Sequence, residues 1–336
     1  MFLFYQHVLT QLGNNYQSTM LNKQNGKSHR KMTQENFEPS TQQLLWVENY
    51  CGKLTAKIRV LGGGAATSAW LLTGRDGRSW VLKTGLGFRS NEENHSLFTK
   101  ELTNLSLAHP FIKRLVPKPV AKGPVEVFPH GGILMAGKKG STILNNPNIA
   151  PLVMAEAVNK VATLTGRVDS TELPGYDKWL PDVPAGRTLW DLPVYTNVPA
   201  HWQNCAHTAI EVSQGKGLYI LHRDLHPGNV LADQHGLTAI VDWAEMCTGP
   251  SPAIDVSRAR VQLWLLFGQL VSEQFLTACT VPHDPVYDAV VICELGDPAD
   301  WLWEAYHSGG GCSDTAMLRT RMDEVVKYTS SVCAGN

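Results

Sequence analysis

The sequence predicts an α+β fold with two lobes: a small β-rich lobe with one helix, followed by a larger, mostly helical lobe. Two observations lead to this prediction. Short apolar runs separated by glycine-rich turns fill the first part of the chain, and helical periodicity dominates from residue 151 onward. With 336 residues, of which 43% are hydrophobic, the chain is long enough to bury a substantial core in such a bilobal unit.

Strand-like runs and one helical pattern make up the predicted small lobe. Glycine-rich turns join the first three runs, which is typical of β-hairpins. A helical pattern follows, and a short strand then leads into a glycine-containing connector. The three runs cover residues 56–61, 69–73 and 79–84, the helix covers residues 91–107, and the last strand covers residues 131–137.

Helical spacing of apolar residues characterises the larger lobe. Proline opens two of its segments, as is common at a first helical turn. A stretch dense in Pro, Gly and Asp, residues 165–200, is expected to be a long loop or an insertion. The expected helices are residues 151–164, 201–213, 255–274, 285–295 and 298–307.

These patterns divide the chain into four segments. Residues 1–44 are expected to be a disordered or variable lead-in, because their later part is rich in Asn, Gln, Ser and Lys, and Met32 is an alternative start. Residues 45–137 form the small lobe and residues 138–310 the large one. Residues 311–336 are expected to be a C-terminal helix or tail.

Charge and cysteine content disfavour several classes of protein. A formal net charge of −1 argues against a general affinity for nucleic acid or anionic membranes. The apolar start lacks the basic residues and cleavage pattern of a signal peptide, and no run is long enough to span a bilayer. The seven cysteines include no Cys-x-x-Cys pair, so buried free thiols in a reducing compartment are expected. We therefore expect a cytoplasmic protein.

The most specific polar pattern lies in residues 220–243. Asp224 follows an apolar run, Asn229 comes five residues later, and Asp242 ends a second apolar run. A carboxylate at the end of a buried strand needs a cation or hydrogen-bond donors. One Asp can accept a proton from a hydroxyl, while an amide oxygen and the other Asp can bind Mg²⁺. Together these groups are typical of phosphoryl transfer from ATP or GTP.

Each of these residues also has a simpler interpretation. Asp242 could cap the following turn, and Asn229 could be a turn residue after Pro-Gly. His222 and His226 could form a zinc site with Asp224, but that would leave the other two polar residues without a role. We expect His222 to anchor the loop in the core and His226 to shape it.

Lys83 and Glu101 are the predicted polar pair of the small lobe. Lys83 alternates onto the same face as Val81, so it is expected to point inward, where it could bind nucleotide phosphates. Helical spacing places Glu101 in an apolar line, which makes it the expected partner, with Glu93 on the same line as the reserve. Surface positions for both side chains are the alternative.

A run of glycines precedes this lysine. Gly62, Gly63 and Gly64, followed by Ser68, would let backbone N–H groups approach phosphates upstream of Lys83. Three glycines between strands more often mark a hairpin. The run is not a Walker A loop, because no Gly-Lys-Ser/Thr follows.

With these motifs, the sequence resembles the aminoglycoside phosphotransferase family, the small-molecule branch of the protein-kinase-like fold. The resemblance covers roughly residues 45–308 and depends on His-x-Asp-x-His-Pro-Gly-Asn-Val-Leu at 222–231 and Val-Asp-Trp at 241–243. Protein kinases carry Asp-Phe-Gly at the metal-binding Asp and a later Ala-Pro-Glu. This chain has neither, which disfavours a protein substrate. The resemblance implies a bilobal protein-kinase-like fold.

The resemblance also implies a role for each motif residue. Asp224 resembles the catalytic base of the family. Asn229 and Asp242 resemble its Mg²⁺ ligands. Lys83 and Glu101 resemble the pair that holds the nucleotide phosphates.

Three further positions take their interpretation from the family. Asp255 resembles an Asp that braces the catalytic loop, and Met135 to Gly137 resembles the hinge whose backbone meets the purine. Many members have Gly where this chain has Arg223. We expect that arginine to pair with a nearby carboxylate.

The expected activity is transfer of the γ-phosphate of ATP or GTP, with Mg²⁺, to a hydroxyl of a small molecule. Residues 273–304 contain no Lys or Arg, so an acidic surface could favour a cationic acceptor such as an aminoglycoside or another amine- or sugar-containing compound. An ordinary solvated face is the alternative. Macrolides, homoserine, choline-like alcohols and ketosamines stay open as acceptors, as does a catalytically silent nucleotide-binding scaffold. The acidic residues are Glu273, Asp284, Asp288, Glu294, Asp297, Asp300 and Glu304.

Overall fold

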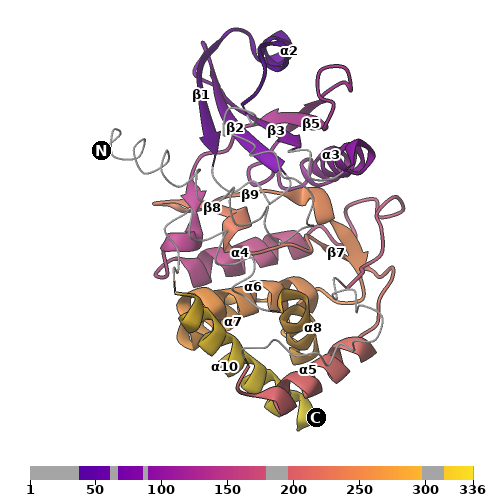
Figure 1. Cartoon of the computed structure of the whole chain (residues 1–336), viewed down its shortest axis with the longest axis vertical. Coiled ribbons are helices and arrows are strands. Elements are labelled where there is room, and N and C mark those ends of the chain that lie inside the picture. Colours follow the sequence, from indigo (N-terminus) through magenta and orange to yellow (C-terminus); the bar gives the residue numbers. More distant parts are fainter. Residues whose placement is uncertain (1–37, 61–66, 86–89, 179–195, 297–313, 336) are drawn as a thin grey trace, which may run out of the picture.

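The computed structural model describes residues 38–60, 67–85, 90–178, 196–296 and 314–335. A small β-rich lobe lies at one end of the molecule and a helical lobe at the other (Figure 1). The predicted α+β bilobal fold is therefore confirmed. Among the described helices, none is both long and apolar enough to cross a bilayer.

The small lobe is built on one antiparallel sheet of five strands, in the order β1-β2-β3-β5-β4. The sequence did not predict β4, because Pro117 and Pro119 were interpreted as the end of the helical region before it. Proline is tolerated there because β4 is an edge strand. The strands are β1 (Leu54–Val60), β2 (Thr67–Gly74), β3 (Ser79–Gly85), β4 (Pro119–Lys122) and β5 (Gly132–Ala136).

The described part of the small lobe has two helices, one more than expected. The additional helix, α2 (Thr41–Cys51), begins after Ser40, whose side chain forms a capping box with Gln43. Val47 of α2 is buried in the apolar cluster that covers one face of the sheet. The helix thus begins inside the segment 1–44 that was expected to be a lead-in, and its Ser-x-x-Gln start signal was overlooked.

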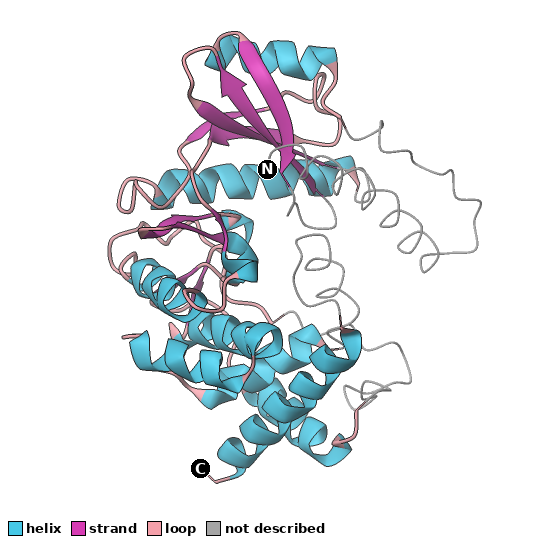
Figure 2. Cartoon of the chain, turned by 90° about the vertical axis from the view of Figure 1, so that its left-hand side faces the viewer, coloured by secondary structure: helices cyan, strands magenta, loops and turns pink. Residues whose placement is uncertain are grey.

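Helix α3 (Asn91–Ala108) lies between the lobes and contributes to both. Figure 2 shows this long helix between the sheet and the helices of the large lobe. Its buried Phe98 and Leu105 belong to the same apolar core as residues of α4 (Ala150–Ala162). Asn104 of α3 also donates to the backbone carbonyl of Trp243, at 2.7 Å. This packing holds α3 against the segment that follows Asp242.

The large lobe consists mainly of helices. The helix expected at 255–274 is in fact two, because Gly268 adopts a φ of 92° and ends the first of them. The helix expected at 298–307 lies outside the described residues. The helices after α4 are α5 (Pro199–Glu211), α6 (Ala253–Phe267), α7 (Gln269–Ala278), α8 (Pro285–Leu295) and α10 (Thr315–Ala334).

Two small sheets flank the segments that carry Asp224, Asn229 and Asp242. One pairs β7 with β10, and the other has the order β6-β8-β9. The loop with Asp224 connects β7 to β8, and the segment with Asp242 connects β9 to β10. A hydrogen bond of 2.9 Å from the Val241 N–H to the Asn229 carbonyl joins the two segments. The strands are β6 (Ser141–Thr142), β7 (Tyr219–Leu221), β8 (Val230–Asp233), β9 (Gly236–Ile240) and β10 (Cys247–Gly249).

Candidate active site

The loop after β7 is held by hydrogen bonds from two other segments. Asp255 of α6 accepts the backbone N–H groups of His222 and Arg223, at 2.8 and 2.9 Å. The buried His222 ring donates from Nε2 to the Val241 carbonyl, at 3.0 Å. Burial lowers the pKa of His222, which keeps its ring neutral. The expected bracing by Asp255 and anchoring by His222 are both confirmed.

Arg223 occupies a backbone conformation that favours glycine. Its φ is 73°, which costs a residue with a side chain roughly 1–2 kcal/mol. The side chain forms a two-pronged ion pair with Glu294, at 2.7 and 3.1 Å, and donates to the Asp177 carbonyl, at 2.7 Å. Its guanidinium also lies 4.8 Å from the centroid of the Tyr176 ring. These contacts offset the strain, and the expected pairing with a carboxylate is confirmed.

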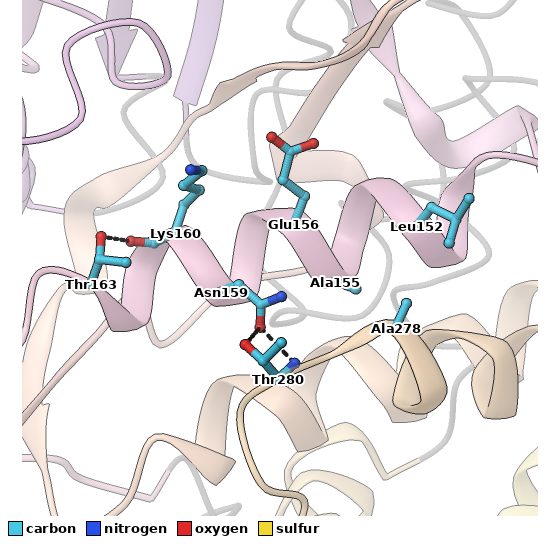
Figure 3. Close-up of a pocket in the computed structure, with 8 residues that line it drawn as sticks. All are labelled: Leu152, Ala155, Glu156, Asn159, Lys160, Thr163, Ala278 and Thr280. Atoms are coloured by element: carbon cyan, nitrogen blue, oxygen red, sulfur yellow. Dashed lines mark hydrogen bonds between the residues drawn. The ribbon is translucent and has the colours of Figure 1, made fainter.

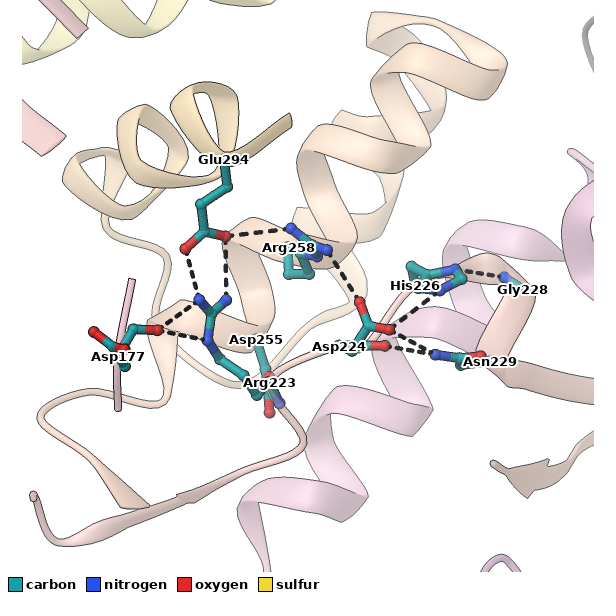
Figure 4. Close-up of polar contacts among 9 residues, drawn as sticks. All are labelled: Asp177, Arg223, Asp224, His226, Gly228, Asn229, Asp255, Arg258 and Glu294. Atoms are coloured by element: carbon teal, nitrogen blue, oxygen red, sulfur yellow. Dashed lines mark hydrogen bonds and ion pairs between the residues drawn. The ribbon is translucent and has the colours of Figure 1, made fainter. Parts of the chain in front are cut away.

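Both carboxylate oxygens of Asp224 have polar neighbours (Figure 4). Oδ1 accepts from Arg258 at 3.0 Å, while Oδ2 lies 3.3 Å from the amide nitrogen of Asn229 and 3.7 Å from Nε2 of His226. Burial alone would raise the pKa of Asp224, but the permanent charge of Arg258, which donates to Oδ1, opposes it, and that pKa lies below its usual range. Asp224 is therefore an ionised carboxylate with a fixed orientation.

Asn229 and Asp242 present oxygens suited to Mg²⁺. The amide nitrogen of Asn229 donates to the Asp224 carbonyl at 2.9 Å, which turns the amide oxygen away from that carbonyl. Asp242 has a φ of 62°, a strained conformation of the kind found at functional sites. Mg²⁺ is often bound by one or two such protein groups together with substrate phosphates. The residues present therefore fit the predicted metal.

The zinc interpretation of the two histidines finds no support. The Nε2 atom of His222 is occupied by the Val241 carbonyl, and Nδ1 of His226 accepts the Gly228 N–H at 3.0 Å. Within the described ranges, no group of three or more His, Cys, Asp or Glu side chains is arranged to hold a metal. His226 shapes the catalytic loop, as expected.

Lys83 joins the two lobes through an ion cluster in which Lys83 and Glu101 are buried and Asp242 is partly exposed. Its Nζ lies 2.9 Å from Glu101 and 2.7 Å from Asp242 of the large lobe. Burial would lower the pKa of Lys83, but the two carboxylates raise it above its ordinary value, so the ammonium stays charged. The expected Lys83–Glu101 pair is present. The reserve partner, Glu93, instead forms the capping box of α3 with Ser90.

The predicted phosphate loop is only partly described. Gly62, Gly63 and Gly64 lie outside the described residues. Ser68 lies at the start of β2, and its buried hydroxyl has no hydrogen-bond partner among the residues that the structure describes. A buried hydroxyl of this kind at the end of a glycine-rich segment is compatible with a ligand oxygen nearby.

Backbone hydrogen bonds at the end of β5 limit which groups of the predicted hinge could contact a purine. Met135 is buried, and the N–H of Gly137 donates to the Ser79 carbonyl at 2.8 Å. A Cβ atom on Gly137 would lie 2.8 Å from the Cβ of Ser79, so glycine allows the close approach of β3 and β5. The N–H of Ala136 donates to the backbone carbonyl of Lys118 at 2.9 Å. A hinge contact with a purine would therefore use a carbonyl of this segment or a later residue.

The acidic run at residues 273–304 does not form the expected surface in its described part. The side chains of Asp288 and Glu294 are buried, and arginines from other segments neutralise them. Asp284 caps α8 by accepting the Val286 N–H, which leaves Glu273 as an exposed carboxylate. Three members lie outside the described residues, namely Asp297, Asp300 and Glu304.

Arg258 is a site residue that sequence reasoning missed. It contacts Asp224 directly and is 7% exposed. It lies one helical turn after Asp255, in a helix whose residues are buried from Ala253 to Leu266. A buried guanidinium needs an anion, as the buried ammonium of Lys83 does. An arginine one turn after Asp255 was therefore the signal in the sequence that could have indicated a partner for Asp224.

A groove of about 490 Å³ lies elsewhere, between α4 and the residues around Ala278 and Thr280 (Figure 3). Exposed Glu156 and Lys160 line it together with Asn159, which accepts from the Thr280 N–H and hydroxyl at 2.9 Å. None of the predicted catalytic residues lines this groove. It has no part in the site described above.

Comparison with known proteins identifies the family. The model of the phosphotransferase enzyme family, APH, matches residues 57–277, which is well over half of the chain. The chain belongs to this family. The matched part of this phosphotransferase contains Lys83, Glu101, the loop around Asp224 and Asp242.

Solved structures support the same fold for the phosphotransferase. A thermostable mutant of aminoglycoside phosphotransferase APH(4)-Ia, in a ternary complex with AMP-PNP and hygromycin B, has a TM-score of 0.54 and 16% identity, covering 85% of this chain and 98% of that one. Spectinomycin phosphotransferase APH(9)-Ia, in complex with ADP and spectinomycin, has a TM-score of 0.53 and 14% identity, covering 86% and 96%. At such identities the likeness shows the fold alone. No curated protein matches the chain.

Proposed function

We propose that this protein transfers the γ-phosphate of ATP or GTP to a hydroxyl of a small molecule. The observation that carries the proposal is the contact of 2.7 Å between Lys83 of the small lobe and Asp242 of the large lobe. It joins the predicted phosphate-binding lysine to the predicted metal ligand. Asn229, which links this segment to the loop of Asp224, completes the set that phosphoryl transfer requires.

Each residue has a distinct task in the proposed reaction. Glu101 holds Lys83, whose charge would bind the nucleotide phosphates. Asn229 and Asp242 would hold Mg²⁺, which neutralises charge on the phosphates. Asp224 would accept a hydrogen bond from the acceptor hydroxyl and orient it toward the γ-phosphate. Positioning and charge neutralisation would supply most of the acceleration.

The acceptor that we propose is an aminoglycoside or a related amine- or sugar-containing compound. Two structural neighbours were crystallised with hygromycin B and with spectinomycin, which makes these compounds the first to test. The acidic run gives less support to a cationic acceptor than expected, because Asp288 and Glu294 are neutralised within the protein. Neutral hydroxyl compounds therefore belong in the same substrate panel.

The proposed setting is the cytoplasm, which supplies ATP and GTP. All six cysteines of the described residues are free thiols. Free thiols are typical of a reducing compartment. A cysteine-labelling comparison of intact cells and lysates would test this location.

The proposal is tested with purified protein, ATP or GTP, Mg²⁺ and a panel of aminoglycosides, macrolides, amino alcohols and sugars. We expect phosphate transfer to at least one acceptor, measured by mass spectrometry of the product. Asp224→Ala should abolish transfer while calorimetry still detects nucleotide binding, because Lys83, Glu101 and the metal ligands are unchanged. Nucleotide binding without transfer by the wild type would favour a silent scaffold. Full activity of Asp224→Ala would refute the assigned role.

A further inference from the structure

We propose that Arg258 is a positioning residue, which holds the carboxylate of Asp224 in the orientation that receives the acceptor hydroxyl, and that Glu294 in turn holds Arg258. The inference rests on the proposed phosphotransfer function. It extends that function to two residues outside the sequence motifs, one on α6 and one on α8.

One face of α6 supports both the backbone and the side chain at the catalytic position. Asp255 accepts the two backbone N–H groups that precede Asp224, at 2.8 and 2.9 Å. One turn later, Nη2 of Arg258 donates to Oδ1 of Asp224 at 3.0 Å. A single rigid helix therefore fixes the path of the loop and the direction of its catalytic side chain.

Arg258 cannot turn freely, because its guanidinium is held on a second side. Its Nη1 donates to Oε2 of Glu294 at 3.3 Å, and Glu294 is 1% exposed. Glu294 is itself fixed by the two-pronged ion pair with Arg223. The guanidinium is planar, so contacts at both terminal nitrogens fix its plane as well as its position.

The result is a buried row of alternating charges, Arg223, Glu294, Arg258 and Asp224 (Figure 4). Each carboxylate and each guanidinium in the row faces an opposite charge. Removing one member takes an opposite charge away from its buried neighbours, which is costly, so the row resists rearrangement. The position of Glu294 on α8 therefore helps to set the position of the Asp224 carboxylate.

This arrangement fixes the orientation in which the Asp224 carboxylate meets the acceptor. Oδ1 is engaged by Arg258, while Oδ2 faces Asn229 at 3.3 Å and His226 at 3.7 Å. Without Arg258, the carboxylate would lose its strongest donor and could rotate about its Cβ–Cγ bond. The acceptor hydroxyl would then meet a differently oriented carboxylate, whereas Lys83 and the nucleotide contacts would stay in place.

The test compares Arg258→Met, Arg258→Lys and Arg260→Met in the full-length protein, with the acceptor found in the substrate panel. Misplacement of a reacting group by about 1 Å costs on the order of 10²-fold in rate, so we expect a fall of about that size in kcat for Arg258→Met. The KM for nucleotide should change by less than about twofold. Arg258→Lys should recover roughly tenfold of the loss, because an ammonium still donates to one carboxylate but cannot bridge two.

Arg260→Met is the matched control on the same helix. Arg260 is also buried and also paired with a carboxylate, Asp288, and its guanidinium lies 5.1 Å from the Trp264 ring. Among the described residues, its side-chain ion pair and ring contacts involve Asp288, Trp264 and Tyr328, and none of them belongs to the loop around Asp224. We expect this variant to lower Tm while leaving kcat of the folded protein unchanged.

The outcomes separate this inference from the proposed function. Wild-type kcat in Arg258→Met, or equal losses of kcat in Arg258→Met and Arg260→Met, would overturn the inference while transfer by the wild type upholds the function. If the wild type transfers phosphate to no acceptor, the function is refuted and ATP hydrolysis becomes the readout, since Asp224 would orient water in the same way. Equal hydrolysis by wild type and Arg258→Met then overturns the inference. A wild type that neither transfers nor hydrolyses overturns both.

Discussion

Replacing Asp255 by Asn tests whether α6 holds the catalytic loop through backbone hydrogen bonds. Asp255 is 3% exposed, and its two oxygens accept from His222 at 2.8 Å and Arg223 at 2.9 Å. Asn has nearly the same shape, but only one oxygen can accept. Its NH2 group would face the second backbone N–H, so one of the two donors would be left without an acceptor.

The expected cost follows from these two contacts. A buried donor left unsatisfied costs about 1–3 kcal/mol, and the remaining hydrogen bond loses its charge assistance, which is worth about 1 kcal/mol. Burial raises the pKa of Asp255, so removing its charge returns part of this cost. We therefore expect a loss of about 2–3 kcal/mol in stability, and a fall of on the order of 10²-fold in kcat if the loop shifts by about 1 Å.

The assay is thermal denaturation combined with steady-state transfer to the acceptor identified by the panel. Asp288→Asn is the matched control, because Asp288 is a fully buried carboxylate that contacts Arg260 and His283 and not the catalytic loop. It should lower Tm and preserve kcat of the folded protein. Wild-type kcat in Asp255→Asn, or an equal fall in kcat in the control, would refute the assigned bracing role.

Two further predictions concern the catalytic loop and the small lobe. Arg223→Gly should relieve about 1–2 kcal/mol of backbone strain. It also leaves Glu294 with one arginine fewer, which costs about 3–5 kcal/mol, so Tm should fall. An unchanged or higher Tm would contradict this reasoning. Glu101→Gln should weaken nucleotide binding, measured by calorimetry, because Lys83 loses its buried carboxylate. Glu93→Gln should leave nucleotide binding unchanged and cost stability only at the cap of α3, and equal effects of the two variants would argue against the chosen pair.

Local regularities explain why much of the site could be predicted from the sequence. The alternation of a strand placed Lys83 inward, and the four-residue spacing of a helix placed Glu101 on its buried line, so the pair that the structure shows at 2.9 Å was expected. The same holds for the loop around Asp224, where a short motif sets the spacing of its own groups. Such rules predict which face of a strand or helix a side chain occupies. Once Lys83 and Glu101 were both expected on inward faces, their pairing followed.

The elements that were missed depend on signals that local rules weigh poorly. Ser40 and Gln43 announce α2, but they lie at the end of a polar segment that is typical of disorder. Gly268 breaks the helix expected at 255–274, yet every residue of α6 except Phe267 is buried, so no polar face marks where the apolar pattern should stop.

The sequence by itself determined the two-lobed fold, the order of the catalytic groups and the lysine–glutamate pair, because each depends on spacing within one segment. Only the tertiary structure decided which side chains surround Asp224 and whether the acidic side chains of residues 273–304 are exposed or neutralised. Arg223, Arg258 and Glu294 come from a loop and two helices, and together with Asp224 their charges balance only when α6 packs beside α8. The charges of residues 273–304 alone do not predict this neutralisation, because the arginines belong to other segments of the chain. These arginines make Glu294, which was expected on an acidic surface, a buried partner of the side chains around Asp224.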